Sequence, residues 1–233
     1  MLTQYRMSPP IGNLVSQTFY RGKLCNGSRA VPEEIYQHAP AALRSVVTWL
    51  DTSNQGQRAH HLDDRGISIY NRCEADQIIS LLKDVSDNTE FVEQLSALAS
   101  EGESVIGVIC MYSEQKRVLR QKFNQEIWSD GFKDLVKIDT VDSYQGKENR
   151  IIIISLTRSD KRLSPGFLRV SNRINVAMSR AMDRLMIVGN ADMWRGVNKG
   201  LPLGSVVHYM TERGEEAGYV FLPAKVEARK SDD

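Results

Sequence analysis

The sequence predicts an α/β fold in which a largely parallel sheet carries helices on both faces. Apolar runs of strand length recur along the chain, and segments with helical spacing of apolar residues separate them. The continuous runs are VIGVIC (105–110), VKIDT (136–140), IIIIS (151–155) and RLMIVG (184–189). Such runs are typical of strands buried on both faces, and their alternation with helices favours parallel connections.

The N-terminal part of the chain predicts one helix and one short strand. Ser8 followed by Pro9 is a helix-start signal, and apolar residues then recur at helical spacing as far as Gly22. Residues 46–50 predict a strand, and the polar stretch 51–66 predicts a loop.

The remaining helices are predicted from caps and from apolar spacing. Asn71, with Glu74 three residues on, resembles a capping box and begins a helix. Further helices are expected over 91–99, 113–126 and 172–181. We expect the domain to cover residues 1–222, and the polar residues 223–233 to form a tail without fixed structure.

Composition and charge exclude several classes of protein. With 233 residues, 41% of them hydrophobic, the chain can bury one sizeable core. Thirty basic against 29 acidic residues give a net charge of +1, so any nucleic-acid site must be a local patch. No apolar run approaches the roughly 18 residues of a membrane span, and the N-terminus lacks a signal-peptide pattern. We therefore expect no membrane partner and an intracellular, cytoplasmic protein.

The cysteines and histidines do not predict a metal site. Cys25, Cys73 and Cys110 are odd in number and far apart, without a CxxC pair, as expected in a reducing compartment. His60 and His61 lie together in a polar loop, where histidines are more often solvated than bound to metal.

The stretch after the predicted strand 136–140 concentrates groups that could bind a ligand. Six polar side chains surround Gly146 there: Thr140, Asp142, Ser143, Gln145, Lys147 and Glu148. In open parallel sheets, ligands bind beyond the carboxyl ends of the strands. A solvated polar turn is the alternative interpretation for any single one of these residues.

The stretch SNRINVAMSRA (171–181) carries two arginines. Arg173 and Arg180 lie seven residues apart, about two helical turns, so on one helix they share a face. Such a pair is either a solvated stripe or a phosphate clamp, because the planar guanidinium fork matches phosphate oxygens.

These stretches resemble motifs of the superfamily 1 helicases, in the branch that includes the nonsense-mediated-decay RNA helicase. The resemblance to motifs IV, V and VI lies in LTQYRMSPPIGNLVSQTFYRGKL (2–24), IDTVDSYQGKENRIIIIS (138–155) and GFLRVSNRINVAMSRAMDRLMIVGN (166–190). SIYNRCEA (68–75) and IGVICMYSEQKRVL (106–119) resemble the linking segments of that branch. Five motifs in the family's order make the resemblance specific, and they cover nearly the whole chain.

The resemblance implies a RecA-like three-layer fold, and specifically the second, C-terminal, of two RecA-like domains that bind ATP between them. The phosphate-gripping sequence GxxxxGK[ST] of the first domain is absent from this chain, since the Gly-Lys pairs at 22–23 and 146–147 are followed by Leu and Glu. The expected partner is therefore an N-terminal RecA-like domain, normally in the same polypeptide. That domain would be the main holder of the Mg²⁺ ion that accompanies ATP. The isolated chain is expected to be inactive.

The resemblance assigns two arginines to catalysis. Arg6 and Arg180 would reach the γ-phosphate of ATP from the side opposite the first domain. Arginines supplied in this way stabilise the charge of the transferred group in the transition state, and can be worth a factor of about 10³ to 10⁵ in rate.

Six further residues are expected at the nucleotide by the same resemblance: Gln4, Tyr5, Gln145, Gly146, Glu148 and Arg173. Tyr5 would stack on the adenine and Glu148 would bind the ribose hydroxyls, while Gln145 and Gly146 would shape the turn beneath. For Arg173 two roles stay open, contact with a phosphate and bracing of its motif.

The nucleic-acid residues implied by the resemblance are Tyr112, Thr140, Asp142 and Ser143. They would bind sugar and phosphate of a single strand with little sequence preference. The chain departs from the family at Cys110-Met111-Tyr112, where relatives usually carry Thr-Pro-Tyr, so one phosphate-binding hydroxyl is missing. It departs again at residues 171–173, Ser-Asn-Arg in place of the frequent Pro-Arg-Arg, and at Ser179, where relatives carry threonine.

The resemblance thus predicts ATP hydrolysis coupled to 5′-to-3′ movement on single-stranded DNA or RNA. A non-catalytic module that binds nucleic acid or protein on a RecA-like scaffold is the alternative. The arginine pair distinguishes the two, because a scaffold would not need both guanidinium groups on the cleft side.

Overall fold

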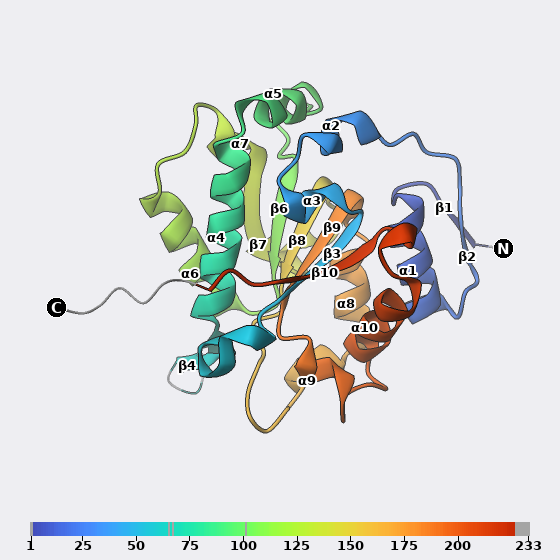
Figure 1. The fold of residues 1–233 in the computed structure, drawn as a ribbon, viewed down its shortest axis with the longest axis vertical. Helices are drawn as coiled ribbons and strands as arrows, with labels where there is room; N and C mark the ends of the chain where they lie inside the picture. Colours follow the sequence, from blue (N-terminus) through green and yellow to red (C-terminus); the bar gives the residue numbers. More distant parts are fainter. Residues whose placement is uncertain (1, 65, 67, 101, 227–233) are drawn as a thin grey trace.

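A six-stranded, all-parallel sheet forms the centre of the molecule (Figure 1). The computed structural model describes residues 2–64, 66, 68–100 and 102–226. In spatial order the strands are β10 (Tyr219–Pro223), β3 (Val47–Asp51), β9 (Ala181–Gly189), β8 (Asn149–Ser155), β6 (Ile106–Cys110) and β7 (Val136–Thr140). The four apolar runs of the sequence are therefore neighbours, as the predicted parallel sheet requires.

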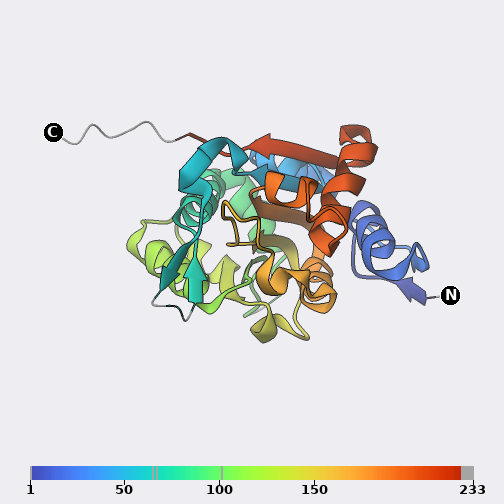
Figure 2. The same ribbon diagram turned by 90° about the horizontal axis from the view of Figure 1, so that it is seen from below.

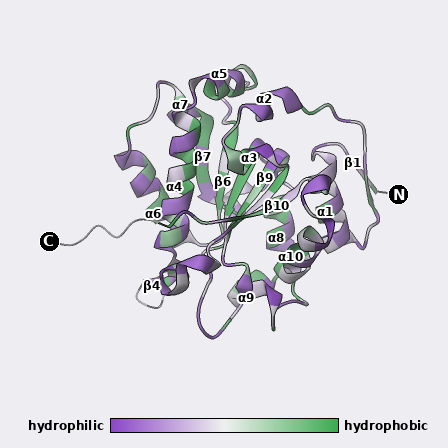
Figure 3. Cartoon of the chain, viewed as in Figure 1, coloured by the Kyte–Doolittle hydropathy of each residue, from purple (hydrophilic) through white to green (hydrophobic). Residues whose placement is uncertain are grey.

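The continuous apolar runs form the strands that are buried on both faces. Every residue of β6 is buried, whereas only Ile138 of the edge strand β7 is buried. In Figure 3 the strands are coloured mainly as hydrophobic, and the helices around them carry much of the hydrophilic colour. Burial on two faces leaves no polar side for a central strand, which explains the absence of alternation in these runs.

Helices cover both faces of the sheet, which confirms the predicted three-layer α/β fold of RecA-like type. One face carries α2 (Glu33–Gln37), α3 (Ala41–Arg44), α4 (Arg72–Ser86), α5 (Thr89–Ala97), α6 (Ser113–Gln125) and α7 (Phe132–Leu135). The other carries α1 (Pro9–Tyr20), α8 (Ser171–Met178), α9 (Asp192–Arg195) and α10 (Pro202–Arg213). Each face has its own buried apolar cluster.

The predicted start of α4 is confirmed, with a change in the role of its acidic residue. The Asn71 side chain accepts a hydrogen bond from the Glu74 backbone N–H at 3.1 Å, as an N-cap does. The Glu74 carboxylate does not accept the Asn71 backbone N–H, which donates to Gln115 Oε1 at 2.7 Å, although Glu74 Oε1 accepts from Asn71 Nδ2 at 3.4 Å. It is fully buried and accepts hydrogen bonds from Ser155 Oγ and from the Thr157 N–H, each at 2.7 Å. Glu74 thereby joins α4 to the carboxyl end of β8.

Two small sheets lie beside the main one. A parallel pair joins β1 (Leu2–Gln4) to β2 (Leu24–Asn26), and an antiparallel pair joins β4 (Leu62–Asp64) to β5 (Ser68–Tyr70). Seen from below in Figure 2, the cyan β4–β5 pair projects from the side of the molecule. The polar stretch 51–66 is thus more ordered than the predicted loop, since it holds the 3₁₀ segment η1 (Ser53–Ala59) and β4.

The C-terminal boundary lies later than expected from the sequence. Pro223 is the last residue of β10, and the Ala224 N–H donates to the Asp51 carbonyl at 2.8 Å. Lys225 donates its backbone N–H to Gln77 Oε1 at 2.8 Å. Residues 223–225 therefore continue the folded domain, and residues 227–233 of the expected tail lie outside the described residues.

Candidate functional site

The two predicted catalytic arginines lie together at the amino-terminal edge of the sheet. Glu148 comes directly before β8 and Arg180 directly before β9, whose first residues pair with each other. Arg6 is brought there because the Ser8 N–H, at the start of α1, donates to the Met182 carbonyl of β9 at 2.7 Å. The expectation that the stretch after residues 136–140 binds beyond a carboxyl end is therefore wrong for Glu148, which lies at the amino end of β8.

The charges at this edge are held in close contact. Arg6 Nε donates to Glu148 Oε2, and Arg6 Nη1 donates to the Ser179 carbonyl at 3.2 Å. Arg180 donates to the Val176 carbonyl and to the Lys147 carbonyl, both at 3.3 Å. Burial, and then the positive charge of Arg6, lower the pKa of Arg180. Two guanidinium groups with one carboxylate leave a net positive site suited to an anion.

Tyr5 presents an exposed ring beside this charged group. It is 67% exposed, and a Cβ added at Gly27 would lie 2.2 Å from Tyr5 Cε1. Only glycine at position 27 lets the ring lie this close to the backbone. Gly27 is a supporting residue that sequence reasoning missed, because the contact joins the β1 and β2 segments and has no local pattern.

Gln4 holds the N-terminal turn and has no free polar group for a ligand. Its Oε1 accepts from the backbone N–H groups of Arg6 and Met7 at 2.9 and 2.7 Å. Its Nε2 donates to the Met7 carbonyl and to Asn26 Oδ1 at 2.9 and 2.8 Å. The amide therefore has a full set of partners inside the protein, and Gln4 positions Tyr5 and Arg6.

Gly146 occupies the position of a tight turn that requires a positive φ. Gln145 has φ −60° and ψ 129°, Gly146 has φ 83°, and the Lys147 N–H donates to the Tyr144 carbonyl at 3.1 Å. These values define a type II turn, in which glycine is favoured at the third position. The turn delivers Glu148 to the start of β8, while the Gln145 side chain stays exposed.

The predicted nucleic-acid residues gather at the opposite, carboxyl-terminal edge. Tyr112, Thr140 and Asp142 line a cavity of about 560 Å³. Ser143 stands beside it and accepts a hydrogen bond from Thr140 Oγ1 at 3.1 Å. The ring of Tyr112, at the N-terminus of α6, packs against Phe167 with 4.2 Å between centroids.

Arg173 belongs to this second site and is distant from Arg180 along α8. The predicted helix 172–181 ends at Met178, so Arg180 lies beyond it and the two arginines do not share a helix face. Arg173, in the first turn, donates to Asp142 Oδ2 at 3.0 Å and lies over the Phe167 ring. Of the two roles left open by the sequence, these contacts favour bracing, because Arg173 lies at the carboxyl-terminal edge and away from Arg6 and Arg180.

The same cavity is also lined by residues that the sequence did not single out, among them Ser113, Arg158 and Phe167. Arg158 could not be singled out, because it follows β8 in a polar stretch without a motif. Phe167 stands within the motif VI stretch, but its position against Tyr112 depends on packing between distant segments.

A larger hollow, of about 1000 Å³, lies beside the Gly146 turn and is lined in part by Lys137, Lys147 and Glu148. Lys137 and Lys147 approach each other there, and this contact is the main cause of a lowered pKa of Lys137. The hollow therefore adds positive charge next to the Gly146 turn.

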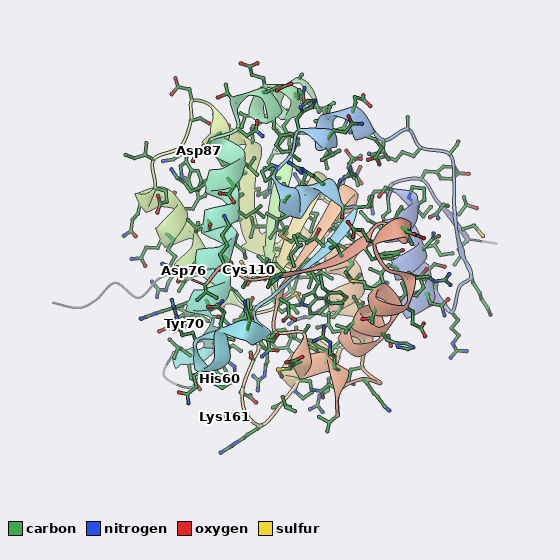
Figure 4. The ribbon with its side chains drawn as sticks, viewed as in Figure 1. His60, Tyr70, Asp76, Asp87, Cys110 and Lys161 are labelled. Carbon is green, nitrogen blue, oxygen red and sulfur yellow. The ribbon has the colours of Figure 1, made fainter. Side chains whose placement is uncertain are left out.

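Metal ligands are not grouped in the part of the chain that the structure describes. There, no set of three or more His, Cys, Asp or Glu side chains is placed to hold an ion. Figure 4 shows His60 with Tyr70 and Lys161 at the lower end of the molecule, while Cys110 lies near its centre and Asp87 at the top. Among the described residues, no helix has the length and apolar character needed to cross a membrane.

Comparison with known proteins shows to which family the chain belongs. A family model described as an AAA domain matches residues 1–192. The chain belongs to this AAA-domain family. The resemblance to the helicase branch that includes the nonsense-mediated-decay helicase is also confirmed, since the relatives that match include two ATP-dependent helicases and a regulator of nonsense transcripts 1 homolog.

Three relatives show the extent of the similarity. The chain is 30% identical over 203 residues to the DNA polymerase alpha-associated DNA helicase A of Saccharomyces cerevisiae, covering 82% of the chain and 27% of that protein. It is 32% identical over 190 residues to the regulator of nonsense transcripts 1 homolog of Drosophila melanogaster, covering 80% of the chain and 15% of that protein. It is 32% identical over 196 residues to the ATP-dependent helicase NAM7 of Saccharomyces cerevisiae, covering 80% and 18%.

The chain thus spans about a quarter or less of the length of these relatives. A solved structure, the C-terminal domain of a possible DNA helicase from Lactobacillus plantarum WCFS1, aligns over 95% of the chain and 99% of its own length, with 11% identity and a TM-score of 0.40.

Proposed function

We propose that the chain is the C-terminal motor domain of an ATP-dependent superfamily 1 helicase or translocase that acts on single-stranded DNA or RNA. The observation that carries this proposal is the gathering of Arg6, Glu148 and Arg180 at one edge of the sheet, beside the exposed Tyr5 ring. A scaffold that only binds a partner has no need for two guanidinium groups held near each other at one edge.

At this edge each side chain has a proposed task. Arg6 and Arg180 would stabilise the negative charge that develops on the transferred phosphoryl group. Tyr5 would stack on the adenine, and Glu148 would accept hydrogen bonds from the ribose hydroxyls. Backbone carbonyls already orient both guanidinium groups, which lowers the entropy lost when they bind a phosphate.

The phosphate-gripping loop would come from an N-terminal RecA-like domain, which would also supply most of the ligands for Mg²⁺. The metal ion would neutralise phosphate charge. The described residues of this chain would contribute the arginines and the nucleoside contacts.

At the carboxyl-terminal edge, Tyr112, Thr140 and Ser143 would bind the sugar-phosphate backbone of one strand. Hydroxyl groups and a partly aromatic wall suit a single strand that is recognised without base reading. DNA and RNA are both proposed substrates, because these groups contact the backbone.

The test is an ATPase assay on the longer protein that carries this chain, with poly-dT and poly-U as stimulants. We expect hydrolysis that rises with one or both polymers and is abolished in Arg180→Ala. Nucleic-acid binding without any hydrolysis would favour the non-catalytic module instead.

A further inference from the structure

Asp142 and Arg173 form an ion pair that lines the carboxyl-edge cavity. Arg173 Nη2 lies 3.0 Å from Asp142 Oδ2, and the two side chains are 40% and 66% exposed. The Arg173 guanidinium also lies over the Phe167 ring, 4.9 Å from its centroid. The Phe167 ring packs against one face of the guanidinium, and the Asp142 carboxylate accepts a hydrogen bond from its Nη2.

The location of Arg173 favours an anionic neighbour. Arg173 is in the first turn of α8, where the helix dipole is positive, and α8 has no acidic residue in that turn. Arg158 lines the same cavity. Asp142, supplied by the 3₁₀ segment η2 (Asp142–Tyr144), provides the negative charge that this corner needs.

A carboxylate and a phosphodiester present similar oxygen pairs to a guanidinium fork. An ion pair as exposed as this one is weak, so another anion can replace the carboxylate at little cost. We propose that Arg173 binds a phosphate of the single strand, and that Asp142 occupies the same guanidinium when no strand is bound.

The proposal rests on the proposed function of this edge as the nucleic-acid site, and it changes the role of one residue. Asp142 was expected to contact the strand. In this scheme it competes with the strand, keeps Arg173 over Phe167 and lowers the affinity for nucleic acid.

The test is fluorescence anisotropy of this chain with labelled single-stranded oligo-U and oligo-dT, over a range of salt concentrations. Asp142→Asn should tighten binding about two- to fivefold, the range expected from an exposed ion pair. Arg173→Gln should weaken binding and reduce the magnitude of the salt slope by about 0.7, the value for one phosphate contact on a single strand.

The decisive variant combines both changes. In the Arg173→Gln background, Asp142→Asn should no longer tighten binding, because there is no guanidinium left to release. Asp130→Asn, an equal charge change on an exposed loop before α7, is the matched control and should bind as the parent chain does. The Arg173 Nε–H resonance should shift on addition of oligonucleotide, and should do so at lower oligonucleotide concentration in Asp142→Asn.

Two results overturn the proposal while leaving the nucleic-acid site intact. One is unchanged affinity in Asp142→Asn, and the other is equal tightening with and without Arg173, which would indicate a general charge effect. If the parent chain and Asp142→Asn both fail to bind either oligonucleotide, the proposed nucleic-acid function of this edge fails, and this inference fails with it.

Discussion

Glu74 should make the stability of the domain fall as the pH rises. Its carboxyl group is fully buried, and burial raises its pKa to about 8, although the hydrogen bonds from Ser155 and Thr157 act in the opposite direction. In the unfolded chain the same group would ionise at its ordinary value of about 4.3. The folded state therefore keeps a proton that the unfolded state releases, so the stability associated with Glu74 is present below the unfolded pKa and is lost as the pH rises towards 8.

The size of this effect follows from linkage. Between pH 5 and pH 8, a carboxyl group with these two pKa values lowers the free energy of unfolding by about 3 kcal/mol. For a domain of this size, that corresponds to a fall in Tm of about 6–12 °C. Histidines titrate in the same range, so the measurement must compare two proteins and not two pH values alone.

The comparison is urea unfolding of the parent chain and of Glu74→Gln at several pH values between 5 and 8. The amide keeps the shape and one carbonyl acceptor but cannot ionise, so the variant should lack this part of the pH dependence. The difference in unfolding free energy between the two proteins should shift in favour of the variant by about 3 kcal/mol across the range. A difference that stays constant with pH, or that shifts towards the parent, would refute the reasoning.

Further predictions concern the proposed nucleotide edge and its turn. The isolated chain should show no ATP hydrolysis with or without nucleic acid, and turnover that Arg180→Ala abolishes would contradict this. In the longer protein, Arg6→Ala and Arg180→Ala should each lower kcat by a factor of about 10³ or more while weakening ATP binding only modestly. Arg180→Lys should restore little of this activity, because an ammonium group lacks the guanidinium fork. If Arg180→Ala raised KM alone, Arg180 would be a binding contact and not a catalytic residue. Tyr5→Ala, and Gly27→Val by displacing the Tyr5 ring, should raise KM more than they lower kcat, as measured by steady-state kinetics. Gly146→Ala should lower the free energy of unfolding by about 1 kcal/mol in urea titrations, since φ at this position is 83°; unchanged stability would mean that the turn can relax.

The sequence predicted the parts of the fold that depend on local pattern. The four apolar runs became adjacent parallel strands, and the cap at Asn71 begins α4. It did not predict β10, a short run ending in Pro223 that pairs with β3 from the other end of the chain. It also missed β1 and β2, since strands of three residues are specified by their partners and not by their own periodicity.

The sequence placed Arg6 and Arg180 at one site, but it did not predict that the site residues would divide between two edges of the sheet. The stretch from Thr140 to Glu148 was read as one ligand loop, yet it leaves the carboxyl end of β7 and reaches the amino end of β8. Its first residues therefore belong to one edge of the sheet and its last residues to the other. Only the order of strands in space, with β6 between β7 and β8, reveals this division.

The same topology joins the two edges by a rigid element. Helix α8 has eight residues and spans about 12 Å, with Arg173 in its first turn and Arg180 just beyond its end. Ile174, Ala177 and Met178 fix it in the core, so it cannot bend without disturbing close-packed side chains. A rigid shift of α8 would therefore move Arg173 and Arg180 together. In the proposed helicase, this would give strand contact and phosphate contact a direct mechanical link.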